Sequence, residues 1–157
     1  MKHSDLTVGL ARAADAKTIA NMSRQLIETG LNWRWTEQRV AASINDPEIN
    51  VLVARLNNRL AGFGIMKYGE RVGHLNLFAV APDCQRAGIG RELLHWLERC
   101  ASVAGILAIS LEVRAANTGA QRFYECMGYR TLVQLPGYYQ GIETAVRMGR
   151  RLTVIRT

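Results

Sequence analysis

Residues 75–90 read LNLFAVAPDCQRAGIG, and this stretch determines how the rest of the chain is interpreted. Residues 75–80 are an apolar run that predicts a strand, and Pro82 ends it because proline has no backbone N–H to give to a sheet. A glycine-containing loop at 85–90 follows, and the amphipathic residues 91–104 predict a helix directly after it. Glycines let a backbone approach an anion, and a helix N-terminus adds partial positive charge. The stretch therefore predicts a cradle for a pyrophosphate group.

The composition limits the classes of protein to which this chain can belong. The 157 residues are enough for one domain with a single core, which we take as residues 1–157. With 48% hydrophobic and 21% charged residues, the chain has the composition of a soluble globular protein. No apolar run reaches the ~20 residues of a membrane helix, and the first residues lack the apolar core of a signal peptide. The three cysteines lack the paired spacing of metal sites. We therefore expect a cytoplasmic protein with reduced thiols and no bound metal ion.

The net charge of +7 favours polyanionic partners. Arginines are spread along the chain, with one local cluster at Arg147, Arg150 and Arg151. Stacking aromatics do not accompany this cluster as they do in proteins that bind single-stranded nucleic acid. The sequence therefore favours a phosphate-bearing cofactor over nucleic acid, and Arg86 and Arg91 add charge beside the predicted cradle.

The remaining segments predict an α/β fold. Periodicity and turn residues indicate helices at 16–28, 36–44 and 117–128, and strands at 6–13, 50–56, 60–68, 107–113, 129–135 and 144–148. We expect Asp15 to cap the first helix, Asn57 and Asn58 to form a tight hairpin, and residues 136–141 to form a turn. The strands on either side of the helix at 91–104 form a parallel crossover. The result is a mixed, mostly antiparallel central sheet with flanking helices.

Two motifs in this arrangement resemble those of the GNAT superfamily of acyl-CoA-dependent N-acetyltransferases. Residues 85–90, QRAGIG, fit its Q/R-x-x-G-x-G/A pyrophosphate signature between a strand and a helix. Residues 117–129, NTGAQRFYECMGY, are similar to its N-x-x-A-x-x-F/L-Y-E-x-x-G-F/Y segment. Residues 111–117, LEVRAAN, resemble the ribosomal-protein alanine N-acetyltransferases (RimI-like). The resemblance covers residues 6–149 and is specific from about residue 75 onward.

The resemblance implies that the two parallel strands splay apart around the pantetheine arm of acetyl-CoA. In such a fold the strand backbone pairs with the arm, the loop N–H groups hold the pyrophosphate, and Asn117 contacts the arm. Tyr124 would protonate the leaving thiolate, and Glu112 lies where relatives place a general base. The cofactor-binding residues implied in this way are Phe78, Ala79, Val80, Gln85, Arg86, Ala87, Gly88, Ile89, Gly90 and Asn117.

The implied functional residues also have interpretations in terms of structure alone. Asn117 is a good helix cap, and Tyr124 shares a helix face with Phe123, so that it could belong to the core. Glu112 stands in an apolar strand and could pair with Arg114, two residues on and on the same face. Four aromatic residues are candidates to line the acceptor site, with core packing as the alternative: Trp33, Trp35, Tyr138 and Tyr139.

The sequence therefore predicts an N-acetyltransferase that moves the acetyl group of acetyl-CoA directly to a primary amine. The motif at 111–117 favours a peptide N-terminal α-amine as the acceptor. The N-terminal half, with the loop at 33–35, shows no clear match to that subfamily and leaves room for a small-molecule or amino-acid-like amine. A non-catalytic acyl-CoA-binding module is the other alternative, and a homodimer stays open.

Overall fold

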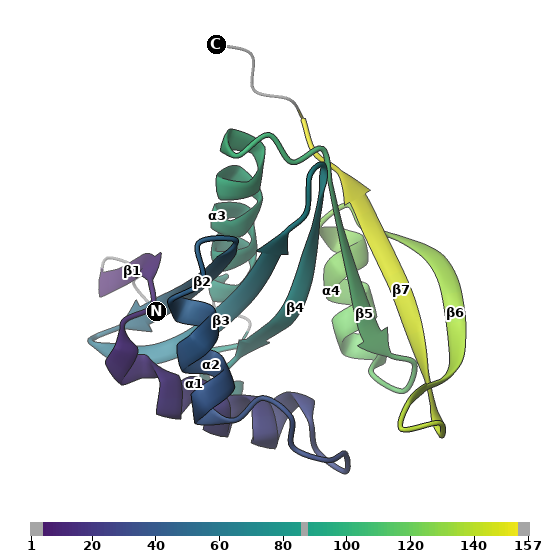
Figure 1. Cartoon of the computed structure of the whole chain (residues 1–157), viewed down its shortest axis with the longest axis horizontal. Helices are drawn as coiled ribbons and strands as arrows, with labels where there is room; N and C mark the ends of the chain where they lie inside the picture. Colours follow the sequence, from purple (N-terminus) through teal and green to yellow (C-terminus); the bar gives the residue numbers. More distant parts are fainter. Residues whose placement is uncertain (1–4, 86–87, 154–157) are drawn as a thin grey trace.

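The computed structural model describes residues 5–85 and 88–153, and the described strands form one seven-stranded sheet in the order β1-β2-β3-β4-β5-β7-β6 (Figure 1). The strands are β1 (Leu6–Leu10), β2 (Ile49–Leu56), β3 (Arg59–Tyr68), β4 (Val72–Val80), β5 (Ala108–Arg114), β6 (Arg130–Tyr139) and β7 (Glu143–Arg151). The helices are α1 (Ala16–Met22), α2 (Glu37–Ile44), α3 (Ile89–Val103) and α4 (Thr118–Cys126). β4 and β5 are parallel, whereas the other neighbouring strands are antiparallel. The predicted mixed sheet with a parallel pair is confirmed.

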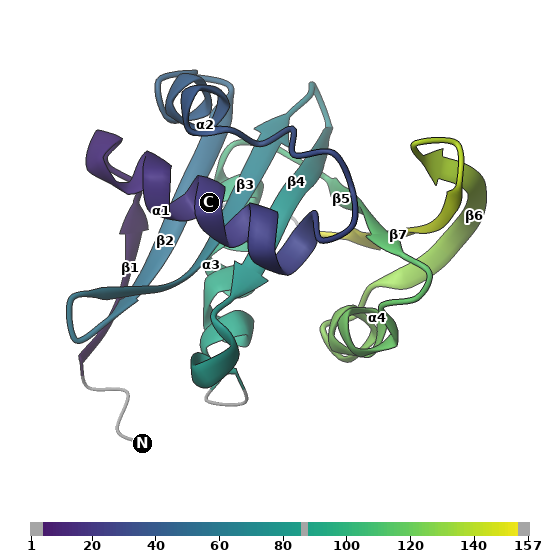
Figure 2. The ribbon, with the colours of Figure 1, turned by 90° about the horizontal axis from the view of Figure 1, so that it is seen from below.

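Helices cover both faces of the sheet (Figure 2). α1 and α2 pack on one face, where Ile19 and Val40 are buried against Phe63 of β3. α3 and α4 pack on the other face, over a core that includes Leu111 and Met148. The apolar stripe predicted for α3 is buried throughout: Ile89, Leu93, Leu94, Leu97 and Ala101. Among the helices of residues 5–85 and 88–153, none is long and apolar enough to cross a membrane.

Turn signals in the N-terminal half are partly confirmed. Asn57 and Asn58 have φ angles of 54° and 66°, as predicted for a tight hairpin. Asp15 is the N-cap residue of α1, as predicted, but its side chain makes no capping hydrogen bond to this helix. A 3-10 turn precedes α1, and the Asp15 carboxylate accepts the N–H of Arg12 at 2.8 Å and pairs with Arg55 instead. The helical segment therefore begins one turn before the predicted cap.

α1 ends in a π-helical turn, Ser23–Ile27, instead of continuing as an α-helix. A π turn inserts one residue into the helix, and such turns are frequent at functional sites. The hydroxyl of Ser23 donates to Glu28 at 2.8 Å, and Glu28 accepts the backbone N–H groups of Arg34 and Trp35 at 2.7 and 3.3 Å. The buried Glu28 carboxylate therefore fixes the loop between α1 and α2.

β6 extends through most of the segment predicted to be a turn. Residues 136–141 were expected to reverse the chain, but the strand continues to Tyr139 and the turn begins at Gln140, which has a φ of 55°. Proline is tolerated here because β6 is an edge strand and its pairing with β7 is irregular after Leu135. Tyr138 therefore lies on a strand, beside the candidate site.

β4 and β5 are joined only over their first residues. Their pairs run from Val72 with Ala108 to Leu75 with Leu111, although β4 continues to Val80. Figure 1 shows the two strands meeting at their N-terminal ends and diverging toward their C-terminal ends. The backbone groups of β4 beyond the last pair therefore have no β5 partner, and such a strand edge can pair with an extended ligand.

Candidate active site

The predicted cradle lies between the C-terminal end of β4 and the N-terminus of α3. Gly88 is the N-cap of α3 and has a φ of 80°, a left-handed conformation that favours glycine. Within the described residues no side chain caps α3, so its first N–H groups are left for another acceptor. Nε2 of Gln85 donates to the carbonyl oxygen of Val80 at 3.0 Å and holds the loop against the strand. Arg86 and Ala87, also predicted here, lie outside the described residues.

The described part of the cradle fits a phosphate group. A Cβ atom built on Gly88 meets nothing within 4 Å, so the space above this residue is open and only its φ requires glycine. A Cβ on Gly90 would lie 3.3 Å from Phe123, so this position is closed by packing. Uncapped N–H groups and the helix dipole supply what a phosphate oxygen requires. The pyrophosphate contacts of Gln85, Gly88, Ile89 and Gly90 remain predictions.

The free edge of β4 adjoins the cradle. Phe78, Ala79 and Val80 pair with β3 on one side and have no β5 partner on the other. The N–H of Ala81 donates to the carbonyl oxygen of Ala61, so by the alternation along a strand the backbone groups of Ala79 also face β3. Those of Phe78 and Val80 face the free edge and are available to the amides of an extended ligand. Asn117 caps α4, because its side-chain oxygen accepts the N–H of Ala120 at 3.0 Å. The capping role is confirmed, and a contact of Asn117 with the ligand remains a prediction.

Tyr124 projects from α4 into an aromatic cluster. Its ring centroid lies 6.2 Å from that of Phe78, 5.3 Å from that of Phe123 and 5.7 Å from that of Tyr129. Burial raises the pKa of the Tyr124 phenol, so the group keeps its proton. Within the described part of the chain its hydroxyl has no hydrogen-bond partner, whereas that of Tyr129 donates to Glu98 at 2.8 Å. Tyr124 therefore combines core packing with a hydroxyl that keeps its proton.

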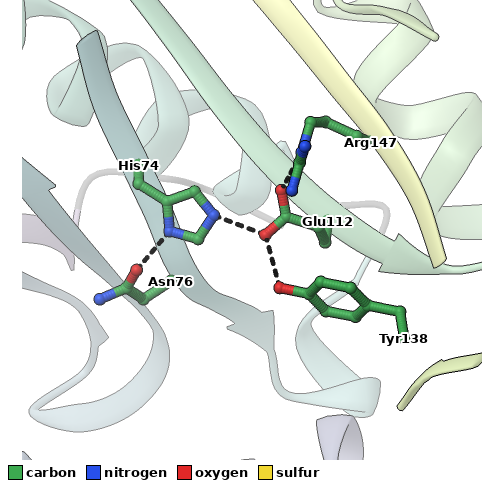
Figure 3. A network of polar contacts seen from close by, with 5 residues as sticks. All are labelled: His74, Asn76, Glu112, Tyr138 and Arg147. Carbon is green, nitrogen blue, oxygen red and sulfur yellow. Dashed lines mark hydrogen bonds and ion pairs between the residues drawn. The ribbon is translucent and has the colours of Figure 1, made fainter. Parts of the chain in front are cut away.

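Glu112 lies at the centre of a polar network on the opposite face of the sheet (Figure 3). One carboxylate oxygen lies 2.6 Å from Nε2 of His74 and accepts the hydroxyl of Tyr138 at 3.1 Å. The other accepts Nε of Arg147 at 2.8 Å. The pairing of Glu112 with Arg114, considered as the alternative, is wrong, because Arg114 pairs with a glutamate of β7. Four strands, β4 to β7, thus contribute to the network.

The network fixes the charge state of Glu112. Burial alone would raise the pKa of this carboxyl, but the hydrogen bonds from His74 and Arg147 outweigh burial and bring it to about 2. The pKa of His74 is raised, first by the hydrogen bond to Glu112, although burial acts in the opposite direction. Glu112 is therefore a carboxylate at neutral pH, and the His74 ring is more basic than an isolated imidazole.

The four aromatic residues predicted to line the acceptor site occupy different environments. Trp35 is buried with 9% exposure in the core beneath α1 and α2, and Arg39 lies 3.8 Å from its ring centroid. Trp33 packs against the edge of that core. Tyr138 is 46% exposed, and Tyr139 meets it edge to face at 5.0 Å. The two tyrosines lie beside Glu112, whereas Trp35 has the environment of a packing residue.

Two loops meet above the network through contacts that the sequence does not reveal. Nη1 of Arg114 donates to the carbonyl oxygens of Thr29 and Ile27 at 2.6 and 3.3 Å, while Nε and Nη2 pair with Glu143. The backbone N–H of Asn32 donates to the side chain of Gln140 at 2.6 Å. The loop after α1 and the turn between β6 and β7 are therefore tied together over the end of β5.

Sequence reasoning missed His74 and Arg147 as site residues. His74 and Asn76 are polar positions two residues apart in an otherwise apolar strand, which was the available signal. Arg147 was noticed only as part of a basic cluster. In residues 5–85 and 88–153, no group of three or more His, Cys, Asp or Glu side chains gathers that could hold a metal ion.

Comparison with known proteins shows the family to which this chain belongs. A sequence profile described as the acetyltransferase (GNAT) domain matches residues 18–152, which is most of the chain. The chain belongs to the GNAT family of acetyltransferases. This GNAT chain is 32% identical over 117 residues to the ribosomal protein bS18 alanine N-acetyltransferase of Escherichia coli K12, covering 73% of this chain and 78% of that one. It is 41% identical over 99 residues to an uncharacterized N-acetyltransferase of Methanocaldococcus jannaschii, covering 61% and 62% of the two chains.

Solved structures share the fold of this GNAT chain. The crystal structure of the ribosomal-protein-S18-alanine N-acetyltransferase from Escherichia coli superposes with a TM-score of 0.82 at 25% identity and covers 96% of both chains. Arabidopsis thaliana NAA60 in complex with acetyl-CoA gives a TM-score of 0.81 at 18% identity, over 93% of this chain and 98% of that one. The predicted family and its resemblance to ribosomal-protein alanine N-acetyltransferases are confirmed, and the chain is an acyl-CoA-dependent N-acetyltransferase.

Proposed function

We propose that this chain transfers the acetyl group of acetyl-CoA to the α-amine of a peptide or protein N-terminus. The observation that carries the proposal is the parting of β4 from β5. A proton donor, Tyr124, lies on one face of the sheet beside this parting, and the Glu112 network lies on the other. The relative from Escherichia coli, named for its action on an alanine of a ribosomal protein, supports the same class of acceptor.

The binding roles follow from the backbone. The N–H groups of the described cradle residues and the free edge of β4 at Phe78 and Val80 would hold acetyl-CoA, with the side chain of Asn117 beside them. Bound acetyl-CoA supplies an activated thioester. The backbone N–H near Val80 faces the position where negative charge develops on the carbonyl oxygen, and a preorganised donor there stabilises the transition state. The net charge of +7 favours the phosphate-bearing ligand further.

Proton transfer takes place on the two faces of the sheet. On the α4 face, the Tyr124 hydroxyl donates its proton to the departing thiolate, and a thiol with a pKa of about 8.5 needs only modest help to leave. On the α1 face, the network around Glu112 receives the proton that the acceptor nitrogen loses. Positioning of the amine over the thioester carbon supplies the larger part of the rate increase.

The acceptor class follows from the acidity of amines. An α-amino group has a pKa of about 7.7–8.0, whereas a lysine side chain has one of about 10.4. Near neutral pH the α-amine is already partly deprotonated, while lysine is neutral to only about one part in a thousand. The positive charge of the chain also repels polyamines. An α-amine is therefore the better substrate for a site with one modest base.

Release of free CoA thiol from acetyl-CoA tests this proposal. We expect turnover with peptides that begin with alanine or serine, and much slower turnover with spermidine. The matched control is the same peptide with its α-amine blocked and an internal lysine left free, which should give almost no thiol. Efficient turnover of spermidine, with none on either peptide, would overturn the acceptor assignment. Turnover of amino-acid-like small amines alone would favour the small-molecule alternative.

The cellular setting of this activity belongs to the same proposal. We expect the enzyme to act in the cytoplasm as a single domain spanning residues 1–157. The three cysteines, Cys84, Cys100 and Cys126, are free thiols in the structure, which suits a reducing compartment. The acceptor would be a peptide or protein N-terminus, without nucleic acid or membrane partners, and a homodimer stays open.

A further inference from the structure

His74 has an environment that differs from that of its partner Glu112. Leu75 and Leu111 pack toward α3, so the adjacent residues His74 and Glu112 point to the opposite face, toward α1. The His74 side chain is 39% exposed, whereas that of Glu112 is 6% exposed. Both carboxylate oxygens of Glu112 already accept hydrogen bonds, from His74, Tyr138 and Arg147. The Glu112 side chain is therefore almost fully covered, whereas part of the His74 side chain is open to solvent.

We propose that His74 accepts the proton lost by the acceptor amine, and that Glu112 is a positioning residue that holds the imidazole ring. The inference rests on the proposed acetyl transfer and assigns its proton step to one side chain. Figure 3 shows the His74 ring between Glu112 on one side and Asn76 on the other, with Nδ1 directed along β4 toward Asn76. Glu112 thus orients Nε2, and Nδ1 is the nitrogen that exchanges the proton, at the moment when the Asn76 side chain turns away and a water takes its place.

The Asn76 side chain can form a hydrogen bond with Nδ1 of His74 in both protonation states of the ring. Asn76 is an additional residue in β4, because Leu75 pairs with Met66 and Leu77 pairs with Ile65 of β3. In the structure both His74 nitrogens face oxygen atoms, which suits the charged, doubly protonated ring. When the ring is neutral, Nε2–H still donates to Glu112, and a half-turn of the Asn76 amide presents its NH2 group to Nδ1. The bulge therefore provides a partner for the ring before and after proton uptake.

The distances along β4 require water between the amine and the ring. Residues of a strand advance about 3.3 Å each, and the N–H proposed to face the carbonyl oxygen lies near Val80, six residues beyond His74. The ring reaches toward Asn76, which shortens the remaining path to about 13 Å, measured from Asn76 to Val80 at the level of their backbones. An amine held about 3 Å from the thioester carbon leaves a gap that a short chain of about two to three waters would bridge.

The proton balance of the step is complete without another reactant. As the amine nitrogen forms its bond to the carbonyl carbon, the N–H bond breaks and its electron pair stays on nitrogen. The proton passes through water to Nδ1 of His74, and the imidazolium then releases it to solvent. The C–S bond breaks on the other face, where the thiolate takes the Tyr124 proton. The ammonium form of the acceptor loses one proton to solvent before attack, and Tyr124 regains its proton from solvent after the thiol leaves. One proton is therefore released overall for each ammonium group acetylated.

The other groups near His74 determine the direction of its pH dependence. Glu112 on β5 and Asn76 on β4 raise the pKa of the ring, while Arg147 on β7 lowers it less. Tyr138 on β6 hydrogen-bonds to Glu112. Further charged groups on packed elements are Lys67, the cross-strand neighbour on β3, and Arg24 of the π turn, which lies 5.0 Å from the Trp33 ring centroid. The rate should rise with pH as the ring becomes neutral, through a pKa above that of free histidine.

Glu112 is poorly suited to accept this proton itself. Its pKa of about 2 makes it a weak base toward an amine that titrates near pH 8. A general base works best with a pKa near the operating pH, and a histidine with a raised pKa meets that condition. The carboxylate contributes by holding the ring and stabilising its charged form.

The test compares His74→Gln, Glu112→Gln and the control His95→Gln, which changes an exposed histidine on α3. kcat and kcat/KM are measured from pH 6 to 9 with two peptides whose α-amines differ in pKa. We expect His74→Gln to lower kcat by about 100-fold. It should also remove the increase of rate with pH that occurs at the same pH for both peptides. Glu112→Gln should keep that rise but move it to lower pH. His95→Gln should match the wild type.

An NMR titration of the histidine ring protons gives a second readout that does not need turnover. His74 should titrate above the range of a free histidine, and Glu112→Gln should lower its pKa. If kcat of folded His74→Gln stays within about twofold of wild type, or if Glu112→Gln and not His74→Gln removes the common rise, the assignment to His74 is overturned. Failure of the wild type on all α-amines overturns the proposed function instead, and the titration then still reports on the His74–Glu112 pair.

Discussion

The two ends of the candidate site are built from different parts of the chain. The cofactor end consists of the uncapped start of α3, the positive φ of Gly88 and the free edge of β4, all of which are backbone features. The acceptor end consists of His74, Glu112, Tyr138 and Arg147, whose side chains come from four strands. The cofactor end should therefore be sensitive to changes of backbone geometry, and the acceptor end to changes of single functional groups.

The largest expected effect is at the cofactor end. Acetyl-CoA should raise the melting temperature of the protein, since a ligand that binds the folded state stabilises it. Gly88→Asp should abolish this rise, because it places a side chain and a negative charge at the phosphate position and strains a φ of 80°. Thermal unfolding with and without acetyl-CoA measures the effect.

The matched control is Gly105→Asp at the other end of α3. Gly105 has a φ of 87°, and a Cβ there also meets nothing within 4 Å. The two variants therefore introduce the same charge and similar backbone strain, and only Gly88→Asp should lose the response to acetyl-CoA. Equal responses in both variants would place the phosphate site elsewhere.

The next effect concerns the proton donor. Tyr124→Phe keeps the ring in its aromatic cluster and removes only the hydroxyl, so kcat should fall about 100-fold or more while acetyl-CoA affinity changes little. Tyr129→Phe is the control, because its hydroxyl donates to Glu98 and not to the site. It should lower the melting temperature and leave kcat nearly unchanged. Unchanged kcat in Tyr124→Phe, in an assay limited by chemistry, would reduce Tyr124 to a packing residue.

A smaller effect is expected at the acceptor end, where the stability of the fold should depend on pH. The pKa of Glu112 is lowered from 4.5 to about 2, so its ion pairs stabilise the fold above about pH 4.5 and this contribution is lost as the pH falls toward 2. At pH 7 the contribution is on the order of 3 kcal/mol. Glu112→Gln should therefore be less stable than wild type at pH 7, and the two should converge in acid.

Denaturant unfolding at several pH values measures this difference. Glu143→Gln is a suitable control, since it breaks a more exposed ion pair, with Arg114, outside the network. A stability difference between wild type and Glu112→Gln that stays constant from pH 7 to pH 2.5 would show that the carboxylate is not held ionised by His74 and Arg147.

The smallest effect is expected where the two loops meet. Arg114→Lys keeps the positive charge but cannot bind two carbonyl oxygens and a carboxylate at once. We expect a several-fold higher KM for the acceptor peptide, with kcat and the KM for acetyl-CoA little changed. Steady-state kinetics with each substrate varied in turn would show this. A rise in the KM for acetyl-CoA alone would contradict the assignment of these loops to the acceptor.

The comparison of the two ends also explains what the sequence could predict. The cofactor end follows from residues that are contiguous in the chain, so the strand and the helix around 75–104 are confirmed, although β4 already begins at Val72 and α3 at Ile89. The capping role of Asn117 and the hairpin at Asn57 and Asn58 are equally local signals, and both are confirmed.

The acceptor end depends on strand register, which local patterns do not reveal. Glu112 meets Arg147 because the two are paired across β5 and β7. It meets His74 because His74 pairs with Ser110, which places Glu112, two residues further on, diagonally across from His74 on the same face. The sequence rule that two residues on one strand face can pair led to Arg114 instead. The extended course of β6 past Pro136 was missed for a related reason, since only its place at the sheet edge makes the proline acceptable.

The short joint between β4 and β5 has a consequence for folding. β2, β3 and β4 are joined by hairpin contacts that are local in sequence, whereas β5 reaches β4 only after the whole of α3. Contacts between residues that are far apart in the sequence form late in folding. The joint between β4 and β5 contains only the pairs from Val72 to Leu75 of β4. We expect the acetyl-CoA end to form before the proton-handling residues are in place. The nucleotide end of the ligand then binds a nearly folded chain and favours completion of the catalytic site.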